Sequence, residues 1–123
     1  MINKSTFVLA VQDLQRSADF YRDCLGFDIH EMGDPGWRFF ERDECRMMVG
    51  HCPDTQPAHD IGDHSYFAYL TVDDIDSYYE SVSAKGVDII KPLADEPWGM
   101  TEFGLRTIDG HRMMIGQPSE NGG

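Results

Sequence analysis

The spacing of apolar residues in the first half of the chain predicts one strand, one helix and then three strands. Residues 6–11 (TFVLAV) form a short run of mostly apolar residues, which suggests a strand. Asp13 then stands where a helix cap is expected, and Gly26 where the helix should end. The positions that would face a core at helical spacing are Leu14, Ala18, Tyr21, Cys24 and Leu25. The three strands that follow are predicted at residues 27–32 (FDIHEM), 37–42 (WRFFER) and 45–51 (CRMMVGH).

The second half of the chain has the same order of elements. Residues 66–72 (YFAYLTV) predict a strand, Asp73 or Asp74 is expected to cap a helix, and Gly86 to end it. The apolar positions of this helix are Ile75, Tyr78, Tyr79 and Val82. The last three strands are predicted at residues 87–93 (VDIIKPL), 99–108 (GMTEFGLRTI) and 111–117 (HRMMIGQ).

Matching residues of the two halves lie at a nearly constant separation, which indicates an internal repeat. The matched pairs run from Val11 to Val72 (61 residues), from Gly26 to Gly86 (60) and from Met48 to Met114 (66). The sequence Arg-Met-Met-aliphatic-Gly occurs once in each half, inside the last predicted strand. The separation grows to 66 residues near the end, as longer hairpin loops in the second copy would require.

The stretch between the two copies, residues 52–63, is rich in Pro, Asp and Gly and predicts a linker. We therefore expect one α+β domain over residues 1–123, made of two tandem βαβββ modules. The first module is expected at 1–51, the second at 64–118, and a flexible tail at 119–123. A single module would leave one face of its sheet uncovered, so we expect the two curved mixed sheets to form a cup.

Composition narrows the class of function. Of the 123 residues, 41% are hydrophobic, which suffices for a core, and no apolar run approaches the roughly 20 residues that cross a bilayer. The formal net charge is −12, which disfavours binding to nucleic acids and to anionic membranes. With three cysteines in no CxxC pair and no signal peptide pattern at the N-terminus, we expect a reduced, cytoplasmic protein.

Three segments carry a resemblance to a known family. They are VQDLQRSADFYRDCLGF, LTVDDIDSYYESVSAKGVDI and EPWGMTEFGLRTIDGHRMMIGQP. In this order, over residues from about 6 to 118, the chain resembles the vicinal oxygen chelate superfamily, which includes glyoxalase I, extradiol dioxygenases and fosfomycin and bleomycin resistance proteins. The closing segment is similar to the bleomycin-resistance-like branch. The resemblance implies the paired βαβββ fold and a homodimer.

The resemblance also implies where a metal would bind. Metal-using members place His or Glu ligands early in the first strand and in the middle of the last strand of each module. Those positions correspond here to Thr6, Met48, Phe67 and Met114. A hard divalent cation needs imidazole or carboxylate donors, whereas a thioether suits Cu(I). We therefore expect no metal and no cofactor, with His64, three residues before Phe67, as the one candidate for a displaced ligand.

The same strands supply candidates for ligand binding. Strand alternation puts Met48 and Met114 on one face of each last strand, either as a pliable wall of the cup or as ordinary core packing. Trp37 and Phe39 share a strand face and would stack on a flat ligand, complete the core or form a dimer contact. The resembling branch carries a PWG element beside its groove, which points to Trp98. The full set of ligand-binding candidates is Trp37, Phe39, Met48, Phe67, Trp98, Met100, Glu102, Arg112 and Met114.

Two charged residues on one strand face allow two interpretations. Glu102 and Arg106 lie four residues apart, and either charge would be costly to bury unpaired. We expect a salt bridge between them, or with Arg112 in the next strand. Alternatively, Glu102 is a pocket carboxylate for a cationic ligand, and it is the one candidate for a catalytic residue.

These observations predict a drug-sequestration protein that lacks the family metal ligands and binds a small aromatic or cationic molecule in a cup formed by a homodimer. The alternative is an enzyme of the same superfamily. It would be a metal-dependent lyase or dioxygenase with displaced ligands, or a metal-free isomerase that uses Glu102. A third interpretation is an interaction module whose function is its dimer surface.

Overall fold

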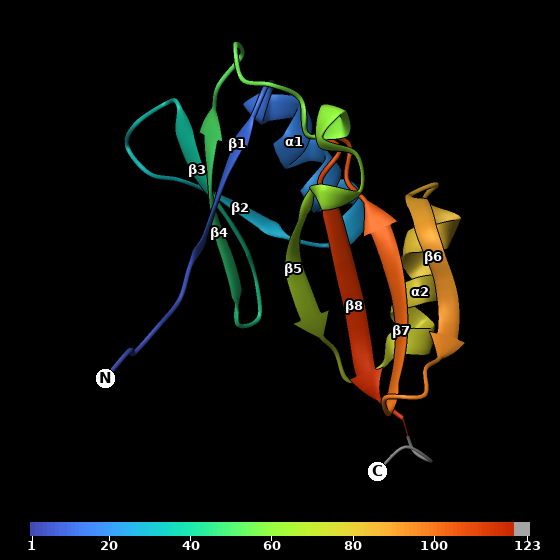
Figure 1. The fold of residues 1–123 in the computed structure, drawn as a ribbon. Coiled ribbons are helices and arrows are strands. Elements are labelled where there is room, and N and C mark those ends of the chain that lie inside the picture. The colour runs from blue at the N-terminus through green and yellow to red at the C-terminus, as the bar shows by residue number, and fades with distance from the viewer. Residues whose placement is uncertain (120–123) are drawn as a thin grey trace. The chain divides into compact units, whose positions relative to one another are not determined.

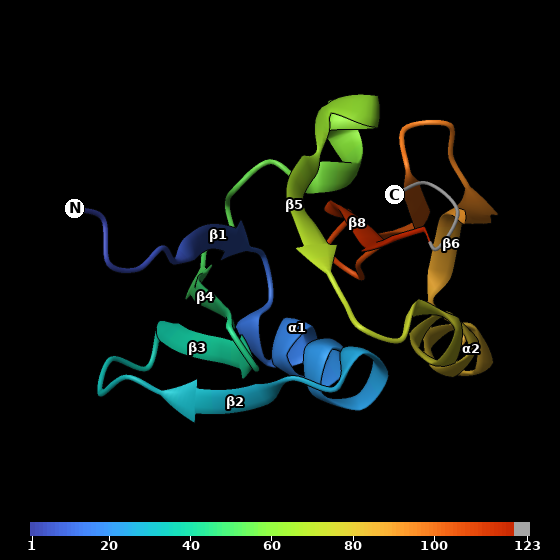
Figure 2. The ribbon, with the colours of Figure 1, turned by 90° about the horizontal axis from the view of Figure 1, so that it is seen from below.

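In the computed structural model, each half of the chain forms a compact unit with one four-stranded sheet and a helix on one face of it (Figures 1 and 2). The structure describes residues 1–119, and for residues 62–64 it describes the backbone alone. Unit 1 is Met1–Pro57, and unit 2 begins at Ala58. The α+β class and the two βαβββ modules predicted from the sequence are confirmed.

Unit 1 follows the predicted order, with one difference in its helix. Its strands are β1 (Phe7–Val11), β2 (Asp28–Glu31), β3 (Trp37–Arg42) and β4 (Cys45–His51). The α-helix α1 covers Leu14–Phe20 and then continues as a π-helix, η1 (Tyr21–Leu25), where one regular helix was predicted. The wider π turns leave both Tyr21 and Leu25 only 1% exposed.

Unit 2 adds one element to the predicted order. A 3-10 helix, η2 (Ala58–His64), lies in the stretch that the composition predicts as a linker. The other elements are β5 (Tyr66–Thr71), α2 (Ile75–Ala84), β6 (Asp88–Asp95), β7 (Met100–Arg106) and β8 (Arg112–Pro118).

The two sheets have the same topology and the same register. Their strand orders are β1-β4-β3-β2 and β5-β8-β7-β6. In each, the first strand pairs in parallel with the last, and the other neighbours are antiparallel. Val8 pairs with Met48 in unit 1 as Tyr69 pairs with Met114 in unit 2, so the repeat read from the sequence is a repeat of sheet register.

The helix ends follow local rules that the sequence contains. The Asp13 side chain accepts a hydrogen bond from the Arg16 backbone N–H (3.1 Å), and Asp74 caps α2 through the Ser77 N–H (3.2 Å). Asp74, rather than Asp73, is therefore the cap. Gly26 ends η1 with a φ of +80°, a left-handed conformation that favours glycine.

The core of unit 1 lies between α1, η1 and one face of its sheet. Alternation along β4 turns Met47 and Val49 to that face, where both are 0% exposed. Tyr21 packs its ring 4.9 Å from that of Phe40, which is also fully buried. Each such side chain contributes about 1.5–3 kcal/mol through burial. The first methionine of the repeated motif is thus a core residue.

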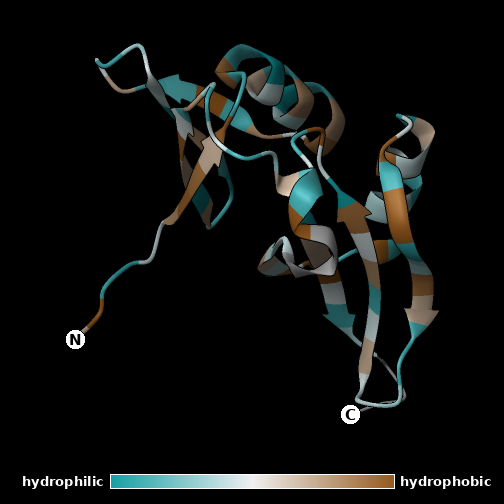
Figure 3. Ribbon diagram, turned by 45° about the horizontal axis from the view of Figure 1, so that its top comes forward, coloured by the Kyte–Doolittle hydropathy of each residue, from teal (hydrophilic) through white to brown (hydrophobic). Residues whose placement is uncertain are grey.

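Unit 2 builds its core in the same way beneath α2. Leu105, Met113 and Ile115 are 0% exposed, and the ring of Tyr79 from α2 lies 5.0 Å from that of Phe103. Figure 3 shows hydrophobic and hydrophilic residues interspersed along the strands. In β8 the buried Met113 and Ile115 alternate with the half-buried Arg112 and Met114. The opposite face of each sheet, called the helix-free face below, carries the other half of the side chains.

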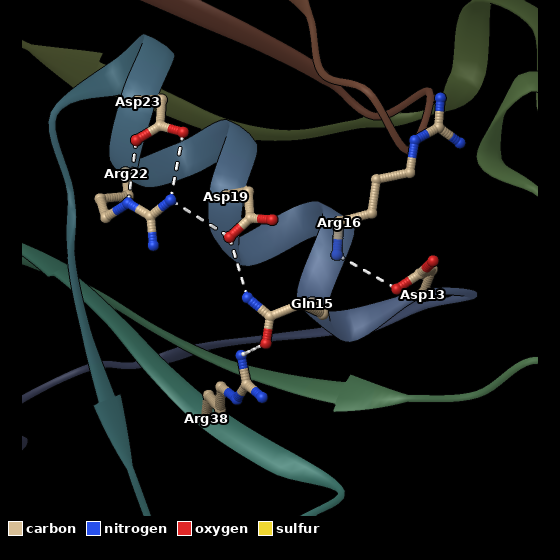
Figure 4. Close-up of polar contacts among 7 residues, drawn as sticks. All are labelled: Asp13, Gln15, Arg16, Asp19, Arg22, Asp23 and Arg38. Atoms are coloured by element: carbon tan, nitrogen blue, oxygen red, sulfur yellow. Dashed lines mark hydrogen bonds and ion pairs between the residues drawn. The ribbon is translucent and has the colours of Figure 1, made fainter.

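The outer surface of α1 carries a polar network rather than a second apolar face (Figure 4). Gln15 donates to Asp19 (2.8 Å) and accepts from Arg38 of β3 (2.9 Å), which connects the helix to the sheet. Arg22 contacts both Asp19 and Asp23. Such exposed ion pairs contribute little to stability, because solvent screens them. In the part of the chain that the structure describes, no helix has the length and apolarity needed to cross a membrane.

Candidate functional site

The helix-free face of unit 1 is aromatic. Phe39 pairs with Met48 across β3 and β4, and Trp37 pairs with Gly50. The Trp37 indole lies flat over Gly50, because a Cβ built on that glycine would be 2.9–3.0 Å from three indole carbons. Glycine is therefore required at this position of the motif by the ring above it. Val8 of β1 borders Met48 on its other side and is 63% exposed.

Arg46, the arginine of the first motif copy, is held on the same face. Its guanidinium carbon lies 3.6 Å from the centroid of the Phe39 ring, a cation–π contact. Its Nε lies 2.9 Å from a Glu41 carboxylate oxygen. The ion pair balances the charge of Arg46 beside the Phe39 ring and the Met48 thioether.

The helix-free face of unit 2 is polar where that of unit 1 is aromatic. Glu102 pairs with Gly116 in register and is 4% exposed. Its carboxylate accepts a 2.6 Å hydrogen bond from the Tyr69 hydroxyl, whose ring crosses over Gly116. Burial of the hydroxyl and, next, this hydrogen bond raise the pKa of Tyr69 to about 12. Tyr69 therefore remains a hydrogen-bond donor throughout the neutral range.

Lys91 of β6 completes this group of charges. Its Nζ lies 2.7 Å from a Glu96 carboxylate oxygen and 3.8 Å from one of Glu102. The salt bridge expected between Glu102 and Arg106 is therefore wrong: Glu102 contacts Lys91 and Tyr69, and Arg106 lies 3.8 Å from Asp88. The strand order explains the change, because β6 flanks β7 and offers Lys91 and Asp88 as the nearer partners.

Three further candidates, Met114, Met100 and Trp98, also belong to unit 2. Met114 is half-buried on the helix-free face, and its sulfur fills the space above Gly104. Met100 begins β7, opposite Pro118. Trp98 is 62% exposed in the turn between β6 and β7.

Phe67 and Arg112 are separated by an irregularity in β5. Tyr66, rather than Phe67, pairs with Arg112, because the register shifts between Tyr66 and Ala68. The Phe67 ring instead makes an edge contact with His111, at a centroid distance of 5.6 Å. The Arg112 guanidinium lies 5.7 Å from the Tyr66 ring, a looser version of the contact between Arg46 and Phe39.

The side chains at the family's metal positions do not fit a hard divalent cation. Met48 and Met114 occupy equivalent places in the two sheets, and Thr6 and Phe67 offer no imidazole or carboxylate. Among the side chains that the structure describes, no three His, Cys, Asp or Glu residues come together as a metal site. The side chain of His64, the candidate for a displaced ligand, lies outside the described part.

Sequence reasoning missed Tyr69 and Lys91. The repeat contains a signal for Tyr69, because a separation of 61 residues makes it the counterpart of Val8, next to the motif methionine. Lys91 has no such signal, because β6 is irregular and its register with β7 shifts twice. The structure thus brings Trp37, Phe39 and Met48 together in unit 1, and Glu102 and Met114 with Tyr69 in unit 2.

These features define the class of proteins built from two tandem βαβββ units. The model of the Glyoxalase/Bleomycin resistance protein/Dioxygenase superfamily matches residues 5–115, and the chain belongs to that superfamily. A comparison with curated proteins finds no match.

Solved structures with the same fold include three that are 21–24% identical to this chain. TioX from Micromonospora sp. ML1 is 22% identical with a TM-score of 0.78, and the match covers 95% of this chain and 99% of TioX. TnmS3, an antibiotic binding protein from Streptomyces sp. CB03234, is 21% identical with a TM-score of 0.76, over 97% and 98% of the two chains. The bleomycin resistance determinant encoded on the transposon Tn5 is 24% identical with a TM-score of 0.77, over 97% and 99%.

Proposed function

We propose that this protein sequesters a small molecule of aromatic or cationic character on its helix-free faces, without a metal ion. The observation that carries the proposal is which side chains stand on the last strand of each unit, β4 and β8. Met48 and Met114 stand at the family's metal positions, beside the Trp37 and Phe39 rings in unit 1 and the Glu102 carboxylate in unit 2. Flat rings stack on such aromatic surfaces, and methionine adapts to varied shapes. The fold shared with an antibiotic binding protein and a bleomycin resistance determinant supports a drug-like ligand.

We also propose that the binding cup forms in a homodimer. Each helix-free face leaves apolar side chains half-buried or exposed, among them Trp37, Met48 and Val8. A symmetric partner would cover such surface. Light scattering coupled to size exclusion is expected to give about twice the 14.0 kDa mass of the chain, and a monomer mass at micromolar concentration would contradict this part.

Calorimetric titration tests the ligand. Metal-free bleomycin, copper-loaded bleomycin and a set of planar aromatic antibiotics would each be titrated into the protein. Trp37→Ala is expected to weaken binding about tenfold, because a stacking partner and its buried area are lost. Gln15→Ala, on the outer surface of α1, is the control and should bind as the unaltered protein does. Absence of binding at millimolar concentration of every compound would show the proposal to be wrong.

A metal-free isomerase is the second candidate, because Glu102 is a buried carboxylate with a tyrosine hydroxyl 2.6 Å away. Such a pair is able to accept and return a proton. Turnover of a bound α-hydroxy carbonyl compound that disappears in Glu102→Gln would favour this function over sequestration. A stoichiometric divalent metal in the purified protein would instead favour a lyase or dioxygenase with displaced ligands.

A further inference from the structure

The Glu102 carboxylate is buried in a group of charges that does not balance. Lys91 lies between two carboxylates, and its Nζ is closer to Glu96 (2.7 Å) than to Glu102 (3.8 Å). The closest donor to Glu102 is the neutral hydroxyl of Tyr69, at 2.6 Å. One cation and two anions leave this group with one excess negative charge. A buried carboxylate in this state gains from any further cation that reaches it.

Tyr69 covers this carboxylate from the solvent side. Its register partner is Met114, but the side chain leans diagonally over Gly116 to reach Glu102. A Cβ at Gly116 would overlap the hydroxyl and lie 2.7 Å from Cζ and 2.9 Å from Cε1. Tyr69 nevertheless remains 46% exposed, so its side chain is able to rotate outward without displacing a core residue. Gly116 thus leaves the space that the Tyr69 ring occupies while it covers Glu102.

We propose that Tyr69 is a hinged cover over a site for an organic cation, an amidinium or a primary ammonium group, which Glu102 binds. The arriving cation replaces a neutral hydroxyl donor with a charged one. Hydrogen bonds between two charged groups are shorter and about twice as strong as neutral ones. The Met114 thioether, which fills the space over Gly104, provides an adaptable wall for the hydrocarbon part of the ligand. The inference rests on the proposed function, because the site lies on one of the two faces assigned to the ligand.

Two small probes of nearly equal size and shape, one a cation and one a neutral amide, test the site. Benzamidine is a planar cation at neutral pH, and benzamide is its neutral counterpart. NMR titration would follow the backbone amide of Gly116, which lies under the Tyr69 ring and reports its departure. Benzamidine is expected to bind at least tenfold more tightly than benzamide and to shift the Gly116 resonance. Saturation with benzamidine that leaves Gly116 unmoved would overturn the proposal.

Two variants, each with a matched control, test the contributions of Glu102 and Tyr69 separately. Glu102→Gln is expected to abolish the preference for benzamidine, while Glu41→Gln, which alters a carboxylate on the face of unit 1, should retain it. Tyr69→Phe removes the hydrogen bond that holds the cover and is expected to tighten benzamidine binding several-fold. Tyr66→Phe is its control, an equally exposed tyrosine of the same strand, and should change the affinity less than twofold.

The outcomes separate this proposal from the proposed function. If Trp37→Ala weakens both probes equally while Glu102→Gln and Tyr69→Phe leave the affinities unchanged, the cation site is wrong and sequestration on the aromatic face remains. If the unaltered protein binds neither probe and no antibiotic, both proposals are wrong. Because Tyr69→Phe retains the charge of Glu102, it tests the site even if Glu102→Gln fails to fold.

Discussion

The two helix-free faces share one backbone register but receive their large side chain from opposite flanks. In unit 1 the indole of Trp37 reaches over Gly50 from the antiparallel neighbour β3. In unit 2 the phenol of Tyr69 reaches over Gly116 from the parallel neighbour β5. The glycine that closes each motif copy therefore has the same purpose in both units, which is to admit a ring that lies across the strand.

The two helix-free faces carry different side chains at equivalent positions. Trp37 and Glu102 occupy equivalent places, each paired with the motif glycine, and Phe39 and Gly104 are equivalent beside the motif methionine. Unit 1 therefore stacks arginine on an aromatic ring, whereas unit 2 buries a carboxylate beneath a phenol. The two copies of the repeat have thus kept the register around their last strands, but one carries an aromatic group on its helix-free face and the other an ionic group.

The largest losses of unfolding free energy are expected on the sheet face that the helix covers, where both units bury a methionine. Met47→Ala and Met113→Ala should each cost about 2–5 kcal/mol of unfolding free energy, because both side chains are 0% exposed and truncation leaves a cavity. Met48→Ala and Met114→Ala, one residue later in each motif, are half-buried and should cost about 1 kcal/mol. Urea unfolding of the four variants measures the difference. Equal losses for Met47 and Met48 would contradict the assignment of one core face per strand.

The next largest effects on stability should distinguish the Trp37 ring over Gly50 from the Tyr69 ring over Gly116. Gly50→Ala brings a Cβ within 3.0 Å of the half-buried Trp37 indole, and we expect a cost of about 1–3 kcal/mol. Gly116→Ala should cost about 1 kcal/mol, because Tyr69 moves into solvent and loses its hydrogen bond to Glu102.

Fluorescence and a third glycine provide the controls for this pair. In a Trp98→Phe background, Trp37 is the sole tryptophan, and its emission should shift in Gly50→Ala and stay constant in Gly116→Ala. Gly36→Ala meets an Asp34 oxygen at an ordinary 3.4 Å and should cost little. A Gly116→Ala variant that is less stable than Gly50→Ala would mean that Tyr69 is not free to rotate.

The sequence predicts the elements and their register well, because strands and helices follow from local spacing and two caps. Equating Met48 with Met114 by counting gives the register that the sheets adopt. Contacts across strands are harder to predict, since they depend on which neighbour has the longer side chain. Glu102 illustrates this, because its partners Tyr69 and Lys91 come from β5 and β6, whereas the predicted partner Arg106 lies on the same strand, β7.

The smallest expected effect is a pH dependence that arises from Tyr69 in unit 2. Tyr69 has a pKa of about 12, above the usual value near 10, so folding favours its protonated form. The stabilisation is complete below pH 10 and is lost as the pH rises toward 12. Two pKa units correspond to about 2.7 kcal/mol, but solvent screens a side chain that is 46% exposed, and we expect about 1 kcal/mol.

Urea unfolding between pH 8 and pH 11.5 measures this loss against the matched variants. The stability of the unaltered protein relative to Tyr69→Phe should be constant up to about pH 10 and then fall, whereas relative to Tyr66→Phe it should show no such step. Absorbance at the tyrosinate band should likewise show that fewer tyrosines titrate above pH 11 in Tyr69→Phe than in the unaltered folded protein, by one group. If Tyr69→Phe loses no group from the late part of the titration, the Tyr69 hydroxyl does not donate to Glu102, and the contrast between an aromatic and an ionic face fails at its central contact.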